Sequence, residues 1–242
     1  MQSEKIKQEE PVTVQNMFNS IAPRYDLLNR LISFGMDKFW RKKAIEKIKE
    51  KRGGKILDIA AGSGDLTLEA TSIDPELIVA SDFAVNMYDF FKKKVERLNK
   101  NCTISFVLCD ALSLPFASGT FDVVMVAFGI RNFSDRIRSL REMNRVLKPD
   151  GMVLILELTY PTNPVVKQMY TLHTKFFLPL IGRIISGHKI AYSYLPHSIE
   201  SFPDNENFTQ IMMDAGFKEV EFQKLTFGTA TIFTGRKPSN PE

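Results

Sequence analysis

The chain has 242 residues, of which 44% are hydrophobic and 25% are charged. This is the composition of an ordinary soluble protein, and the length fits one large α/β domain or a domain with an insertion. The net charge of +4 neither requires nor excludes a nucleic-acid partner, and no apolar run approaches the roughly 18 residues that span a bilayer. The two cysteines, Cys102 and Cys109, match no metal-ligand spacing, so no metal site is predicted.

The N-terminal part of the chain predicts helices. Residues 1–11 are mostly polar and charged, which predicts a flexible N-terminus without a signal peptide. Residues 12–51 carry apolar side chains at helical spacing, interrupted at Pro23 and at 33–35, and form a predicted helical cap. Tyr25 lies just after the proline break, where polar and aromatic side chains crowd together.

The strongest local signal lies at residues 56–65 (ILDIAAGSGD), an apolar run followed by a glycine-rich turn. The run predicts a strand buried on both faces, and the turn leads into a helix. Gly62 and Gly64 carry no Cβ, so the backbone around Ser63 can approach a small molecule closely. A dinucleotide fingerprint requires a third glycine where this chain has Thr67. The turn therefore predicts a small-molecule site, but not the common dinucleotide one.

Carboxylates around this turn favour a cationic ligand. Asp58 lies at the end of the strand and Asp65 opens the helix, so two acids flank the site where a diphosphate would lie. S-adenosylmethionine (SAM) carries a sulfonium and an ammonium and no phosphate, and it fits this charge better. Asp82 ends the next apolar run, where a carboxylate can accept hydrogen bonds from both ribose hydroxyls. The alternative is that Asp58 and Asp65 are only a strand-end acid and a helix N-cap.

From residue 55 onward, strand and helix patterns alternate. We predict strands at 55–60, 77–81, 104–108, 121–127 and 152–157, with helices at 65–72, 84–99 and 135–147. Such alternation implies parallel pairing with right-handed crossovers, and ligands bind outside the carboxyl ends of the strands. Asp110 and Ala111 follow the third strand at this edge, where they can contact the adenine. The alternative for Asp110 is a simple loop acid.

Residues 159–199 interrupt the alternation and contain no Asp or Glu. This basic, apolar insertion is predicted to be helical, with a break near Pro179 and Gly182. A basic amphipathic segment can lie on a lipid surface or form a lid over an apolar substrate, and we favour contact with an anionic or lipidic surface. Packing on the sheet is the alternative.

The chain closes with a predicted helix at 205–215 and predicted strands at 219–224 and 229–236. Residues 52–158 and 200–237 together make up the predicted SAM-binding domain. A final antiparallel strand pair is frequent in SAM-dependent methyltransferases.

Several further stretches resemble one family: RYDLLN (24–29), FGIRNF (128–133), LREMNRVLKPDG (140–151), YSYLPHSI (192–199) and LTFG (225–228). With the glycine turn, they are similar to the UbiE/MenG quinone C-methyltransferase family over about residues 18–237. The FGIRN and Y-x-Y-L-P segments are the most specific of these. The resemblance implies a Rossmann-like class I SAM-dependent methyltransferase of the α/β class, with a mostly parallel seven-stranded sheet, N-terminal helices and a helical insertion after the fifth strand.

The resemblance also implies a reaction, the SAM-dependent C-methylation of a polyprenyl quinol. The first expectation is conversion of demethylmenaquinol to menaquinol, and the alternative within the family is a methoxy-benzoquinol precursor of ubiquinone. Carried over by position, the family's cofactor contacts are Ser63, Asp82, Asp110 and Ala111, beside Gly62 and Gly64 of the turn. Ala127 stands where some members have a serine that touches SAM, and His188 stands where relatives usually have aspartate, so neither role is carried over.

A quinol ring carbon becomes nucleophilic when a neighbouring phenolic hydroxyl loses its proton, so the enzyme must favour the phenolate and align that carbon. Arg131 follows the fourth strand and can stabilise the phenolate, directly or through a water, while Asn132 can orient it. Helices that precede such a sheet often cover its carboxyl edge, which makes Tyr25 a third candidate for the substrate pocket. The alternative for Arg131 is a surface ion pair with Asp135.

The expected partners are a lipid quinol and, transiently, a membrane surface; no nucleic acid is expected, and a homodimer stays open. The expected location is cytoplasmic, peripheral on the inner face of the membrane. Three other classes compete with this interpretation: a nicotinamide-dependent oxidoreductase, a non-enzymatic SAM or lipid binder, and a SAM enzyme that acts on RNA or another small molecule.

Overall fold

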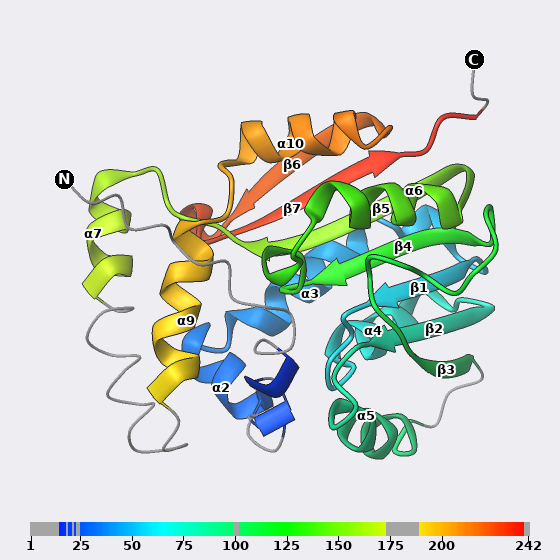
Figure 1. The fold of residues 1–242 in the computed structure, drawn as a ribbon, viewed down its shortest axis with the longest axis horizontal. Helices are drawn as coiled ribbons and strands as arrows, with labels where there is room; N and C mark the ends of the chain where they lie inside the picture. The colour runs from blue at the N-terminus through cyan, green and yellow to red at the C-terminus, as the bar shows by residue number, and fades with distance from the viewer. Residues whose placement is uncertain are drawn as a thin grey trace.

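The structure is a computed structural model that describes residues 15–17, 19–20, 22, 25–98, 102–172 and 189–239, without the side chains of 25, 28 and 189–194. Seven strands form one sheet in the order β3-β2-β1-β4-β5-β7-β6 (Figure 1). The strands are β1 (Lys55–Ile59), β2 (Leu77–Asp82), β3 (Thr103–Leu108), β4 (Phe121–Ala127), β5 (Leu147–Leu158), β6 (Lys218–Leu225) and β7 (Ala230–Arg236).

The strands from β1 to β5 pair in parallel, and β7 runs antiparallel between β5 and β6. This arrangement confirms the predicted mostly parallel, seven-stranded sheet and its closing antiparallel pair. Parallel neighbours require crossover helices, which cover both faces of the sheet, so most residues of its central strands are apolar.

The helices are α2 (Tyr25–Ile32), α3 (Met36–Glu46), α4 (Asp65–Ala70), α5 (Met87–Val95), α6 (Arg136–Val146), α7 (Pro164–Leu172), α9 (Lys189–Glu200) and α10 (Asn205–Asp214). Helices α6 and α10 contribute to the core on one face of the sheet, and α3 and α4 to the core on the other. The helix expected at 84–99 is shorter than predicted, because the backbone that follows β2 first turns around the Asp82 carboxylate.

Side chains of each central strand alternate between the two cores. In β1, Ile56 packs with α3 and α4, whereas Leu57 packs with α6 and α10, and both are fully buried. Successive side chains of a strand point to opposite faces, so one apolar run supplies two layers. The two helical layers hold the sheet edge and its loops in a defined position.

The helix predicted at 135–147 ends at Val146 of α6, whereas the strand predicted at 152–157 already begins at Leu147 as β5. Pro149, Asp150 and Gly151 therefore lie within β5. The Asp150 N–H donates to the Lys237 carbonyl at 3.1 Å, and the Lys237 N–H donates to the Gly151 carbonyl at 2.9 Å. Lys237, which follows β7, therefore extends the ladder around a local turn sequence, which no local pattern could indicate.

The insertion after β5 is helical where it is described, as α7 and α9, while the predicted break at Pro179 and Gly182 lies outside the described residues. Ile199 of α9 is buried against the α3 side of the core, whereas α7 has no buried residue. Helices α2, α7 and α9 lie beyond the carboxyl ends of the parallel strands (Figure 1). In the part of the chain that is described, no helix has the length and apolarity to cross a membrane.

Buried aromatic rings pack beneath α10, and they should contribute strongly to stability. Phe233 is fully buried on β7, and its ring centroid lies 4.8 Å from that of Phe208. Phe233→Ala should lower the free energy of unfolding by about 3–5 kcal/mol in urea denaturation, because it leaves a cavity among aromatic rings.

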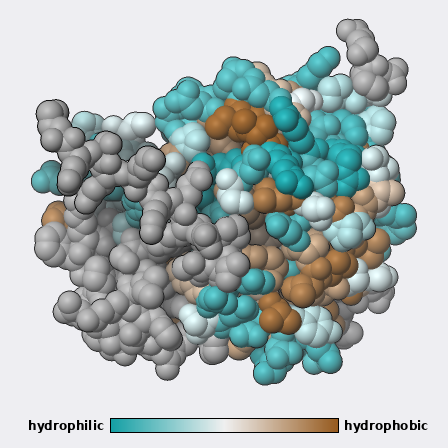
Figure 2. Space-filling view, in the orientation of Figure 1, coloured by the Kyte–Doolittle hydropathy of each residue, from teal (hydrophilic) through white to brown (hydrophobic). Residues whose placement is uncertain are grey.

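The control for this prediction is Met213→Ala on α10. Figure 2 shows an apolar patch over this helix, bordered by hydrophilic residues. Met213 is 45% exposed, so its truncation should change stability by no more than about 0.5 kcal/mol. Equal effects of the two variants would contradict this account of the core.

Candidate active site

The glycine turn between β1 and α4 is held by Asp82 at the end of β2. The Gly62 N–H donates to Asp82 Oδ2 and the Ala84 N–H donates to Asp82 Oδ1, each at 2.8 Å. Gly64 has φ +89°, and a Cβ there would lie 2.6 Å from the Phe91 ring. The turn is therefore tied to the next strand, and its close packing requires glycine.

Asp82 is 6% exposed, and burial raises the pKa of its carboxyl, against backbone hydrogen bonds that lower it. Each carboxylate oxygen can accept further hydrogen bonds beside its backbone N–H donors, so ribose hydroxyls can still bind to Asp82. The predicted ribose contact thus remains compatible with its structural role.

Asp58 combines complete burial with an unused hydrogen-bond acceptor. Thr67 Oγ1 donates to Asp58 Oδ2 at 2.5 Å, while Asp58 Oδ1 is buried and has no hydrogen-bond partner among the described residues. Burial raises the pKa of Asp58 to about 7, although the Thr67 hydrogen bond and the charge of Arg41 act in the opposite direction. A buried acceptor without a donor suits a cationic ligand group.

A pocket lies next to Asp58. Its lining residues are Arg41, Asp58, Ala60, Ala61, Ser63, Asp65, Leu66 and Ala127. The two acids predicted to flank the ligand therefore line one pocket with the glycine turn. The N-cap alternative for Asp65 does not hold, because Gly64 occupies the N-cap position and Asp65 is the first helical residue.

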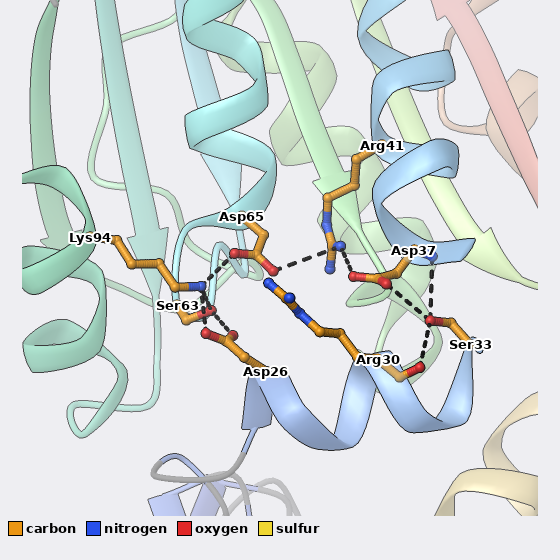
Figure 3. A network of polar contacts seen from close by, with 8 residues as sticks. All are labelled: Asp26, Arg30, Ser33, Asp37, Arg41, Ser63, Asp65 and Lys94. Carbon is orange, nitrogen blue, oxygen red and sulfur yellow. Dashed lines mark hydrogen bonds and ion pairs between the residues drawn. The ribbon is translucent and has the colours of Figure 1, made fainter. Parts of the chain in front are cut away.

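Lys94 joins the N-terminal cap to the glycine turn (Figure 3). Its ammonium pairs with Asp26 of α2 at 2.7 Å and also with Asp65 of α4. Ser63 Oγ accepts from Lys94 Nζ at 2.8 Å and donates to Asp26 Oδ1 at 2.5 Å. The hydroxyl predicted to contact the cofactor is thus shared with the cap, and the pattern of the sequence did not indicate Lys94.

Arg41 of α3 approaches Asp65 from the other side. Its Nη1 pairs with Asp37 Oδ2 at 2.5 Å and lies 3.8 Å from Asp65 Oδ2. Burial alone would raise the pKa of Asp65, but Arg41 and Lys94 outweigh it and hold that pKa below its ordinary value. Asp65 is therefore charged, and residues from the cap supply part of the pocket wall.

Asp110 and Ala111 lie at the same sheet edge, as predicted. The N–H of Cys109 donates to the Asp82 carbonyl at 3.0 Å, which places the loop after β3 beside the end of β2. Asp110 is exposed and its Oδ1 accepts from the Leu112 N–H at 2.9 Å, whereas Ala111 is buried. Their contact with adenine stays a prediction.

Arg131 follows β4 in a short 3-10 helix, Ile130–Asn132, and forms a buried ion pair with Glu157 of β5. The Nη1–Oε1 distance is 2.7 Å, and the Arg131 backbone N–H also donates to Glu157 Oε2 at 3.1 Å. The Asp135 carboxylate, the partner considered from the sequence, instead caps α6 by accepting from the Arg138 N–H at 2.9 Å.

Glu157 is fully buried, and sequence reasoning missed it although an acid in the apolar run LILEL was the available signal. Ser198 of α9 also accepts from Arg131 Nε, at 3.3 Å, so the insertion contacts this side of the site. Asn132 is half-buried beside Arg131. Tyr25 opens α2, but its side chain lies outside the described residues, as does His188.

The comparisons with known proteins agree with this geometry. A model of the ubiE/COQ5 methyltransferase family matches residues 3–237. The chain belongs to this family.

Several relatives match nearly the whole length of this chain. The chain is 42% identical over 225 residues to demethylmenaquinone methyltransferase of Bacteroides fragilis, and the match covers 93% of this chain and 92% of that protein. It is 44% identical over 223 residues to demethylmenaquinone methyltransferase of Thermus thermophilus, covering 92% and 100%. It is also 44% identical over 226 residues to the ubiquinone/menaquinone biosynthesis C-methyltransferase UbiE of Geotalea uraniireducens, covering 93% and 96%.

Solved structures share the fold at low identity. Phosphoethanolamine N-methyltransferase 2 of Haemonchus contortus, in complex with S-adenosyl-L-methionine, matches with a TM-score of 0.58 at 18% identity, covering 81% of this chain and 52% of that one. The [4+2]-cyclase SpnF matches with a TM-score of 0.70 at 16% identity, covering 94% and 96%. The same fold therefore supports different reactions.

The predicted family, the Rossmann-like methyltransferase fold and the SAM cofactor are thereby confirmed. The residues of the site fit the cofactor, because Asp58 Oδ1 is a buried acceptor to which none of the described residues donates, next to an acidic pocket. SAM would be held by the glycine turn, Asp58 and Asp82, with Asp110 and Ala111 near the base.

The raised pKa of Asp58 predicts that SAM binding releases a proton. A ligand ammonium favours the ionised carboxylate, so between about pH 5.5 and pH 7 the SAM affinity should rise with pH. Calorimetry in two buffers of different ionisation enthalpy measures the released proton. Asp58→Asn should abolish both effects, and an unchanged pH profile in that variant would contradict the role of Asp58.

The raised pKa of Asp58 also makes the stability of the cofactor-free protein depend on pH. With a folded pKa of about 7 against an ordinary value of 3.8, the folded state binds more protons than the unfolded state in this window. The stability that Asp58 contributes is therefore present at low pH and is lost as the pH rises towards 7.

Proposed function

We propose that this protein methylates a ring carbon of a polyprenyl quinol, with demethylmenaquinol as the first substrate. The observation that carries the proposal is the identity of 42–44% to relatives named demethylmenaquinone methyltransferase, over nearly the full length of both chains. The relative named for ubiquinone as well as menaquinone biosynthesis supports a methoxy-benzoquinol as the second candidate. Parallel assays of the two quinols with labelled SAM distinguish these substrates.

The reaction needs a nucleophilic carbon next to an electrophilic methyl group. When bound, SAM supplies that methyl group on its sulfonium. The chain's own part is to favour the phenolate form of the quinol and to hold the ring in line. Arg131 is the best-placed cation, because it lies on the loop after β4, at the ligand-binding edge of the sheet.

Glu157 changes how Arg131 can act. The buried pair is neutral overall, so Arg131 works through directed N–H donation to a phenolate oxygen or an intervening water, rather than through net charge. Glu157 orients the guanidinium through its side-chain and backbone contacts. Asn132 lies next in the chain and orients the quinol.

This role predicts the effect of replacing Arg131. Arg131→Ala would leave Glu157 buried without its partner, so the informative variant is Arg131→Gln/Glu157→Gln, which removes both charges of the pair. Quinol methylation should fall by about 100-fold or more, the scale of losing a positioned donor to an oxyanion. SAM affinity, measured by calorimetry, should stay unchanged.

Arg141→Gln serves as the control, because Arg141 is an exposed residue of α6. Its activity should match that of the wild type. Near wild-type methylation by the double variant, with SAM bound normally, would refute the assignment of Arg131.

We also propose that the protein is cytoplasmic and touches the inner face of the membrane through α7. Val165, Met169 and Leu172 lie at spacings of four and three residues, on one face of this helix, and they are 67%, 67% and 53% exposed. An apolar helix face of this kind suits a lipid surface, from which a polyprenyl substrate could enter.

The membrane role predicts a loss of vesicle binding. Val165→Gln/Met169→Gln/Leu172→Gln should reduce co-sedimentation with anionic vesicles and raise KM for a long-chain quinol, because the apolar face is lost. Activity on a soluble short-chain quinol should not change. Met213→Gln, which alters exposed apolar surface on α10, is the control. Unchanged vesicle binding by the triple variant would refute this surface.

A further inference from the structure

We propose that Arg41 binds the carboxylate of the methionine part of SAM, and so selects a zwitterionic ligand for the pocket beside Asp58. This role rests on the proposed function only through its cofactor and does not depend on which quinol is methylated. Arg41 is a residue of the N-terminal cap, so the role makes the cap part of the cofactor site.

The methionine end of SAM carries an ammonium and a carboxylate, so its pocket needs an acceptor and a cation. Asp58 supplies the acceptor through its buried Oδ1. Among the described residues that line the pocket, Arg41 is the one cation. Lys94 lies nearby, but its ammonium already contacts Asp26, Ser63 and Asp65.

The geometry of Arg41 leaves it able to bind a carboxylate. It is 5% exposed, and both of its ion pairs, with Asp37 and Asp65, run through Nη1. Figure 3 shows the guanidinium between these two acids, at the space between α3 and α4. A guanidinium is a planar fork with five N–H donors, so it can hold Asp37 and still present donors to a second carboxylate.

The charges around Arg41 explain why the ligand should be a zwitterion. Asp37, Asp58 and Asp65 all face this guanidinium, so a simple anion such as phosphate would meet these carboxyl groups together with Arg41. An amino-acid group adds one positive and one negative charge, and its ammonium beside Asp58 offsets its carboxylate beside Arg41. The pocket thus favours the methionine end of SAM over other anions.

Arg30 is the alternative cation. It reaches from α2 towards Asp65 in Figure 3, and its charge helps to lower the pKa of that acid. Arg30 is exposed, whereas Arg41 is buried in the pocket wall, and a buried donor gains more from a ligand charge because water screens it less. Arg30 therefore provides the matched control variant.

The test compares two ligands that differ only in the carboxylate, SAM and decarboxylated SAM, by calorimetry. The wild type should bind SAM about tenfold or more tightly than the decarboxylated form, the scale of a charged hydrogen bond. In Arg41→Gln this preference should fall close to one, with binding of decarboxylated SAM retained. Arg30→Gln should keep the wild-type preference.

Because Arg41→Gln leaves the buried Asp37 without its cationic partner, Asp37→Asn/Arg41→Gln is the second variant and should behave in the same way. A preference that survives in both Arg41 variants, or a parallel loss of both ligands, overturns the proposal. Loss of the preference in Arg30→Gln assigns the carboxylate to Arg30 and also overturns it. A wild-type protein that binds neither ligand would refute SAM dependence instead, which separates the two failures.

Discussion

The carboxylate of Asp82 is the interaction on which the cofactor side of the molecule depends. Its two oxygens accept the N–H groups of Gly62 and Ala84, so one side chain shapes the turns after β1 and after β2. These strands are parallel neighbours, so both turns leave the sheet at the same edge. A carboxylate between them pairs backbone donors that would be costly to bury alone, and the glycine turn is held without a ligand.

Acids from the sheet edge meet cations from elements that are distant in the chain. Asp65 of α4 pairs with Lys94 of α5 and lies within 4 Å of Arg41 of α3. Since Ser63 also bonds to Asp26 of α2, the cap is joined to the glycine turn through charged and hydroxyl groups rather than apolar packing alone. The acids at the sheet edge and the cations from the helices therefore form the pocket together.

The substrate side is built differently, around one buried ion pair. Breaking such a pair by removing one partner leaves an uncompensated charge, so Arg131 and Glu157 act as a unit. The pair joins the loop after β4 to β5, and the hydrogen bond from Arg131 to Ser198 adds α9. The insertion thus reaches the groups proposed to handle the quinol, while α7 stays on the surface with its apolar face exposed.

Local patterns in the sequence were enough for the alternating strands and helices, the glycine turn and the acids at the strand ends, because periodicity and glycine act within a few residues. The segments that resemble the family also indicated the reaction. Pairs such as Lys94 with Asp26, Arg41 with Asp65 and Arg131 with Glu157 join positions up to 68 residues apart. Only the packed sheet and cap decide which of many charged side chains meet, since nothing near either partner in the chain specifies the other. For the same reason, local patterns did not indicate that Asp150 and Gly151 pair with Lys237 and lie within β5.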